Sequence, residues 1–292
     1  MVFACAAGLA RAAAAEEPLA ATGGIVPNLA TNVDRPLRYR PDGEDFVVED
    51  GTEFFNRPLY GGHTAFRVDA GDRPELALYL PGRGGNLRLG LRRGTSAKWL
   101  HRADHIVARY RPGTMRYAIR DPLLGDGGVL LVEAVALHQR EALAVRVRRE
   151  GGDDGVELLF AYGGVTGERG RRDGDIGTEA VPIGTYFQLE PERCRDNAIA
   201  LGAGGFRLTS PAATIDGLTP AGATLAVADA RRWDAPQEIF DAAAPGAPPL
   251  LAGHVPLGRA PLDLGLLRAL DGVAPLQAAA LPAAFDLSLI HI

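Results

Sequence analysis

A glycine-rich segment, YGGVTGERGRRDGDIGTE at residues 162–179, concentrates charged side chains within a few turns of backbone. Its candidate binding groups are Arg169, Arg171, Arg172, Asp173, Asp175 and Glu179. Carboxylates two residues apart can hold sugar hydroxyls or a hard cation such as Ca²⁺. Arginine guanidinium groups can equally lock the same carboxylates into bidentate pairs that stiffen the loop. The sequence therefore predicts either a ligand contact or a structural arginine–aspartate knot that docks a neighbouring domain. A solvated surface loop is the remaining alternative.

A second unusual stretch, residues 56–91, is predicted to place polar side chains in tight turns, flanked by glycine or proline, between strands. Arg83 and Asn86 are the candidates for substrate binding or interdomain docking there, because loops on a rigid scaffold commonly carry binding groups. Arg73, in the same stretch, is better explained as a structural turn residue. No metal ligand and no catalytic residue is assigned.

Other motifs carry less weight. His101 and His105 have the spacing of zinc ligands on a helix, but the segment runs into a predicted strand and offers no third ligand. Glu133 and His138 together resemble the His–carboxylate pairs of sugar mutarotases, at a spacing that is not specific. The glycine clusters lack the further residues of a dinucleotide or phosphate-binding loop, so no cofactor is predicted.

The elements that must position these groups are strands. Between residues 37 and 229, nine runs of alternating or continuous apolar residues are each bounded by glycine, proline or aspartate. RPGTM, at residues 111–115, is predicted to be a hairpin turn, and residues 149–157 form a second polar turn. No helical period of a dozen residues interrupts them. The pattern predicts an all-β fold, a large antiparallel β-sandwich of the supersandwich kind.

The predicted organisation has four parts. Residues 1–17 resemble the remnant of a secretory signal peptide, because an apolar stretch leads into small residues and then an acidic pair. Residues 18–230 are predicted to form the sandwich. Residues 231–287, rich in proline, alanine and leucine, are predicted to be a linker, a strap or the start of the next domain, with one short helix near 264–270. Residues 288–292 (SLIHI) resemble translated adapter sequence and are interpreted as a non-native tail.

Composition limits the class of protein. The chain of 292 residues is 47% hydrophobic and has a net charge of −5, which argues against a nucleic-acid partner. No apolar run reaches the length of a membrane span. Together with the leader, this predicts a secreted or periplasmic location. Removal of the leader would leave Cys194 as the single cysteine, so no intramolecular disulfide is expected.

Two stretches carry a family resemblance. FNRPLYGGHTAFRVDAGDRPELALYLPGRGGNL (residues 55–87), and GGVTGERGRRDGDIGTE followed by YFQLEPERCRDN, resemble the long motifs of the domain of unknown function 4450 family. The resemblance covers residues 34–241. It implies a secreted bacterial protein of the six-hairpin glycosidase kind, in which a β-sandwich precedes a helical toroid that carries two catalytic acids. This sequence ends before any such helical array.

The function that follows is an accessory β-sandwich of a secreted glycoside hydrolase-like protein that acts on polysaccharide. We expect the chain to be inactive alone, with carbohydrate and a C-terminal helical catalytic domain as its partners. An autonomous carbohydrate-binding module is the alternative, for which Trp99 and Trp233 are the available tryptophans. A mutarotase-like enzyme that uses Glu133 and His138 is the third reading.

Overall fold

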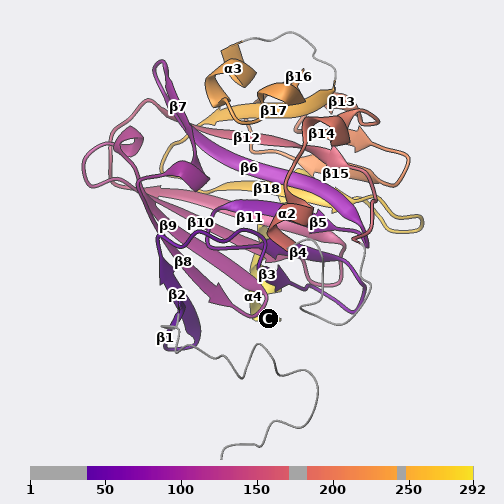
Figure 1. Ribbon diagram of the computed structural model, residues 1–292, viewed down its shortest axis with the longest axis horizontal. Coiled ribbons are helices and arrows are strands. Elements are labelled where there is room, and N and C mark those ends of the chain that lie inside the picture. The colour runs from indigo at the N-terminus through magenta and orange to yellow at the C-terminus, as the bar shows by residue number, and fades with distance from the viewer. Residues whose placement is uncertain (1–37, 171–182, 242–247, 292) are drawn as a thin grey trace, which may run out of the picture. The chain divides into compact units, whose positions relative to one another are not determined.

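The computed structural model describes residues 38–170, 183–241 and 248–291. These residues form two antiparallel sheets that pack face to face, with few helices (Figure 1). The predicted all-β sandwich is confirmed. Its strands are joined mostly by tight turns, as the glycine and proline punctuation indicates.

The larger sheet has ten strands in the order β1-β2-β8-β9-β10-β11-β18-β15-β14-β13. Their bounds are β1 Arg40–Asp42, β2 Asp45–Glu49, β8 His105–Arg111, β9 Thr114–Arg120, β10 Val129–Ala136, β11 Ala142–Glu150, β13 Ala198–Gly202, β14 Gly205–Thr209, β15 Thr214–Leu218 and β18 Leu262–Arg268.

The smaller sheet has eight strands, in the order β16-β17-β12-β6-β5-β4-β3 with β7 paired to β6. Their bounds are β3 Arg57–Leu59, β4 Arg67–Ala70, β5 Glu75–Tyr79, β6 Arg83–Arg93, β7 Ser96–Trp99, β12 Val156–Val165, β16 Thr224–Asp229 and β17 Pro249–Pro256.

Short helices lie in the connections between strands and after the last strand. The α-helices are α2 Ile183–Phe187, α3 Pro236–Asp241 and α4 Leu281–Ile290, and the 3₁₀ turns are η1 Leu100–Arg102, η2 Pro122–Leu124, η3 Pro191–Cys194, η4 Ala230–Arg232 and η5 Ala278–Ala280. Helix α3 lies beside β7, β16 and β17 (Figure 1). No helix in the described ranges is long and apolar enough to cross a membrane.

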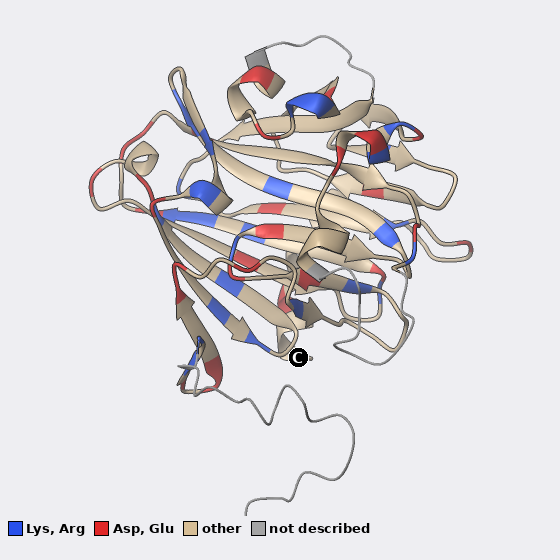
Figure 2. Ribbon diagram, in the orientation of Figure 1, with Lys and Arg blue, Asp and Glu red and all other residues tan. Residues whose placement is uncertain are grey.

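The main core lies between the two sheets and follows from the two-residue period of the strands. On β6, Leu87, Leu89 and Leu91 are buried in the main core cluster. Arg88 and Arg92, which alternate with these leucines, therefore lie on the opposite, outer face of the smaller sheet. Basic and acidic residues recur on neighbouring strands in Figure 2, which is the expected result of this alternation.

Two predicted turns have the expected form. Pro112 and Gly113 link β8 to β9, whose last and first residues pair directly, and Gly113 has a φ of 87° that favours glycine. Residues 151–155 join β11 to β12, which belong to different sheets, so this second turn carries the chain across the sandwich.

The prediction for residues 231–287 differs from the structure. Strand β17 pairs with β12 and β16, and β18 pairs with β11 and β15, so both lie inside the sheets. The predicted helix near 264–270 is likewise wrong, because most of that segment is β18. Both strands have consecutive buried residues, and a strand covered on both faces lacks the alternation that would have identified it.

Helix α4 includes residues 288–290 of the segment that was interpreted as a tail. Its Leu281 and Phe285 cover an apolar patch on the outer face of the larger sheet, formed by Val135, Leu137, Ala142, Ala144 and Leu267. The Ser288 hydroxyl accepts a hydrogen bond of 2.9 Å from the backbone N–H of His138. Residues up to Ser288 are therefore packed against the sandwich.

Candidate functional site

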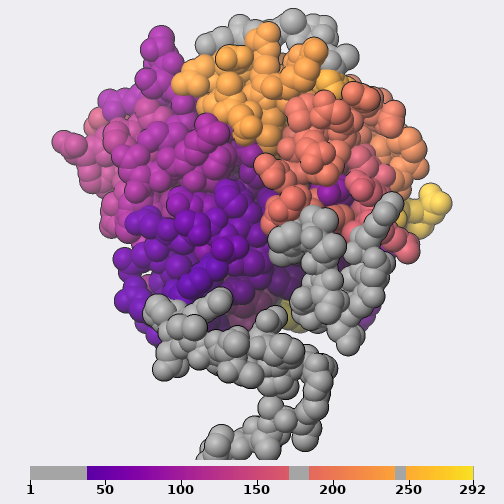
Figure 3. All heavy atoms as spheres, in the orientation of Figure 1, coloured from indigo at the N-terminus to yellow at the C-terminus, as the bar shows by residue number. Residues whose placement is uncertain are grey.

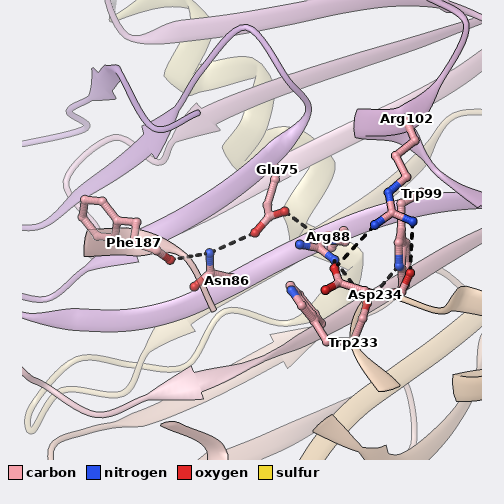
Figure 4. Close-up of polar contacts among 8 residues, drawn as sticks. All are labelled: Glu75, Asn86, Arg88, Trp99, Arg102, Phe187, Trp233 and Asp234. Carbon is pink, nitrogen blue, oxygen red and sulfur yellow. Dashed lines mark hydrogen bonds and ion pairs between the residues drawn. The ribbon is translucent and has the colours of Figure 1, made fainter. Parts of the chain in front are cut away.

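The outer face of the smaller sheet carries a continuous set of polar contacts, which we call the arginine network (Figure 4). Its members are Glu75, Asn86, Arg88, Trp99, Arg102, Phe187, Trp233 and Asp234. Asn86 and Arg88 reach this face because they alternate along β6 with the leucines of the core.

Glu75 is the centre of the network. It lies opposite Arg88 in the register of β5 and β6, and its Oε2 accepts a 2.8 Å bond from Arg88 Nε. Its Oε1 accepts a 3.1 Å bond from Asn86 Nδ2. Burial raises the pKa of Glu75, and the Arg88 guanidinium opposes that shift. A buried charge of this kind is tolerated only with such partners.

Arg88 connects the sheet to a segment more than a hundred residues away. Its Nη1 donates to Asp234 Oδ1 at 2.8 Å and to the Trp233 carbonyl at 3.1 Å, and its guanidinium lies 4.2 Å from the centre of the Trp233 ring. Trp99 Nε1 donates to the same carbonyl at 2.9 Å, and Arg102 Nη1 donates to the Asp234 carbonyl at 3.3 Å. In the space-filling view the magenta segment near residue 100 meets the orange segment near residue 235 (Figure 3).

Arg83 and Asn86 hold the chain on either side of residues 171–182, which we call the charged loop. Asn86 Nδ2 donates to the Phe187 carbonyl at 2.9 Å, beyond the loop. Arg83 Nε contacts Glu168 Oε2 at 3.3 Å before the loop, and its guanidinium lies 4.2 Å from the centre of the Tyr186 ring. The Tyr186 hydroxyl donates to the Glu168 carbonyl at 2.6 Å, which ties the two ends together.

The predicted location of Arg83 and Asn86 in turns between strands is therefore wrong. Both belong to β6 and are 5% exposed, because loop segments and Tyr186 cover this part of the sheet. Arg169 is described and exposed. Arg171, Arg172, Asp173, Asp175 and Glu179 lie outside the described residues, so their roles stay predictions.

A second buried acid lies on the same face and was missed in the sequence. Asp69 on β4 accepts from Arg67 Nε with both carboxylate oxygens, at 2.9 and 3.0 Å. The Arg67 guanidinium also lies 4.0 Å from the centre of the Tyr79 ring. Burial raises the pKa of Asp69 to about 6 against the influence of Arg67. The only signal was the spacing of two charged residues on alternate positions of a short strand.

The two histidines with zinc-like spacing lie in different elements and have different surroundings. His101 lies in η1, where burial and nearby arginines lower its pKa to about 3. His105 begins β8 and its Nδ1 lies 2.9 Å from Asp50 Oδ2. No group of His, Cys, Asp and Glu with the arrangement of a metal site occurs among the residues that the structure describes.

Glu133 and His138 are also far apart. Glu133 is on β10, which ends at Ala136, about 10 Å along the strand from Glu133 at the usual rise per residue. His138 lies beyond that end, where its ring stacks on His291 with 4.1 Å between centroids. In the register of the larger sheet, Glu133 lies between Arg116 on β9 and Arg146 on β11.

The arrangement on this face is suited to holding segments together. Its buried acids are bonded to arginines, and its aromatic rings lie against the guanidinium groups. The network joins β5 and β6 to η1, to the segment at residues 233–234 and to the end of the charged loop.

One solved structure to which this chain is similar is a bacterial glucoamylase complexed with acarbose, with a TM-score of 0.45 and 7% sequence identity. The similarity covers 83% of this chain and 38% of that one, so the chain spans well under half of that protein's length. No curated protein matches this chain in sequence. Residues 80–269, more than half of the chain, match the Domain of unknown function (DUF4450), and the chain belongs to that family.

Proposed function

We propose that this chain is the accessory, non-catalytic β-sandwich of a secreted glycoside hydrolase-like protein that acts on polysaccharide. In this proposal a helical domain of the same protein carries the catalytic acids. The sandwich supports that domain and contributes surface for carbohydrate.

The observation that carries the proposal is the pairing of the buried acids. Every buried carboxylate in the described ranges has a basic partner: Asp45 with Arg111 and Arg116, Asp69 with Arg67, Asp72 with Arg38, Glu75 with Arg88, and Asp121 with Lys98. Glycoside cleavage needs two carboxyl groups that flank an accessible sugar linkage, at a separation of roughly 5–10 Å. Acids committed to arginine or lysine inside the protein do not meet that need.

Asp69 illustrates the point. Its pKa of about 6 would suit a general acid, but both of its oxygens are held by Arg67 and the residue is 3% exposed. A substrate would have to displace Arg67, whose guanidinium lies against the Tyr79 ring, to reach it. The raised pKa is thus a consequence of burial in a structural pair.

The alternative functions receive less support. An autonomous carbohydrate-binding module that stacks sugars on tryptophan is not favoured, because Trp99 is 0% and Trp233 is 3% exposed. A mutarotase-like site at Glu133 and His138 is not favoured, because Glu133 lies within β10 and His138 lies beyond the end of that strand.

Two experiments test the proposal. Purified chain should show no turnover on a panel of polysaccharides, and turnover abolished by Asp69→Asn or Glu75→Gln would contradict it. Sequencing of the genomic DNA downstream of this segment should reveal an open reading frame that continues into a helical domain with paired carboxylates. A stop codon before any such domain would also contradict the proposal.

A further inference from the structure

Aromatic side chains gather where β2 and β8 of one sheet approach β3 of the other. We call this group the aromatic patch: Tyr39, Phe46, Arg57, Tyr60 and Tyr110. Phe46 and Tyr110 are partners in the register of β2 and β8, so their side chains lie on the same face of the sheet. Tyr60 follows directly after β3.

The patch combines two partly buried aromatic rings with two exposed ones. Tyr39 and Tyr110 are partly buried and pack against the main core, so their orientation is set by the fold. Phe46 is 46% exposed and Tyr60 is 52% exposed, which are unusually large fractions for aromatic residues of this protein. Burial raises the pKa of Tyr110, Arg57 opposes this shift and the neighbouring Tyr60 adds to it, as expected for three groups in one cluster.

Arg57 lies between the fixed rings. Its guanidinium carbon is 4.2 Å from the centre of the Tyr39 ring and 5.5 Å from that of Tyr110, and its Nη1 donates to the Asn56 carbonyl at 3.1 Å. Within the described ranges no acid forms an ion pair with Arg57, in contrast to the arginines on the outer face of the smaller sheet. A half-buried guanidinium with free donors therefore lies against Tyr110, and Tyr110 in turn neighbours the exposed rings of Phe46 and Tyr60.

We propose that the aromatic patch binds the sugar rings of a polysaccharide chain. This inference rests on the carbohydrate context of the proposed function and assigns a surface to it. A pyranose ring has a flat face of C–H groups that packs on the electron-rich face of an aromatic ring, and its hydroxyl or carboxylate oxygens accept hydrogen bonds from a guanidinium.

Charge distinguishes a glycan from an apolar protein partner here. A purely apolar protein partner over Phe46 and Tyr60 would also cover Arg57, and it would offer no acceptor for the charge of Arg57. A hydrated sugar chain supplies oxygen atoms at the position of Arg57 and apolar faces at the two rings. The patch therefore fits a ligand that alternates between these two chemistries.

The test is affinity electrophoresis of the full chain in native gels that contain either a soluble neutral glucan or a polyuronate. We expect retardation in at least one gel, and an apparent affinity roughly tenfold weaker for Tyr60→Ala or Phe46→Ala. Tyr60→Phe, which keeps the ring, should retain most of the affinity. Comparison of the two gels with Arg57→Gln distinguishes hydroxyl from carboxylate recognition.

Leu201→Ala is the matched control, because Leu201 lies on β13 and is 46% exposed, the same fraction as Phe46. It should leave retardation unchanged, and equal melting temperatures for all variants will show that each is folded. Absence of retardation in both gels, or retardation that the patch variants do not weaken, would overturn the inference. Neither result would bear on the turnover and reading-frame experiments that test the proposed function.

Discussion

Glu75→Ala should be strongly destabilising because it removes the centre of the arginine network. The Glu75 and Arg88 side chains are 3% and 7% exposed, and their charged atoms are 2.8 Å apart. The change also leaves Asn86 without one of its two acceptors. A buried cation and a buried hydrogen-bond donor therefore both lose the carboxylate of Glu75.

The magnitude follows from what Arg88 retains. Removal of one partner of a buried ion pair costs about 3–5 kcal/mol. Arg88 keeps its 2.8 Å contact with Asp234, whose side chain is 74% exposed and therefore partly screened. We expect the lower end, about 3 kcal/mol, which corresponds to a fall of about 6–12 °C in the melting temperature of a domain of this size.

Thermal and urea unfolding, followed by circular dichroism at neutral pH, measure this change. Asp234→Ala is the control, since loss of an exposed partner should cost about 0–1 kcal/mol. The double variant Glu75→Leu/Arg88→Met, which removes both charges, should be more stable than Glu75→Ala. A loss below about 1 kcal/mol for Glu75→Ala, or a double variant less stable than the single one, would refute the reasoning.

Two further predictions concern the same face. Because burial raises the pKa of Asp69 to about 6, the folded state binds its proton more tightly than the unfolded state does, and the Asp69 contribution to stability should fall by about 3 kcal/mol as the pH rises from about 4 to above 6. Urea unfolding of the wild type and Asp69→Asn across this range measures the difference, and a contribution that rises with pH would contradict the assignment. Asn86→Ala should cost about 1–3 kcal/mol, because Glu75 and the Phe187 carbonyl lose a donor. It should also speed tryptic cleavage at Arg169, and unchanged stability and cleavage would show that Asn86 does not anchor the loop.

The sequence by itself determined the fold class and nine of the 18 strands that the structure describes. Alternation along segments such as residues 87–92 places leucines in the core and arginines outside, and this local period does not depend on the partner strands. The hairpin at Pro112 and Gly113 follows from local backbone preferences in the same way. These features could be predicted because their causes lie within a few residues of the chain.

Only the tertiary structure decided which strands complete the sheets. Strand β17 lies between β12 and β16, and β18 lies between β11 and β15. Burial on both faces removes the alternating pattern, and flanking prolines made the region resemble a linker. The pairing, and hence the extension of the sandwich to Arg268, depends on neighbours far away in the sequence.

The candidate site was likewise only partly visible in the sequence. Arg83 and Asn86 were identified as unusual, but their burial follows from coverage by the loop segments and Tyr186. Arg88 meets Asp234 across 146 positions of sequence, and Asn86 meets Phe187 across 101. Charge pairing at such separations has no local signature, because any of the many acids in the chain would satisfy a given arginine until the fold selects one.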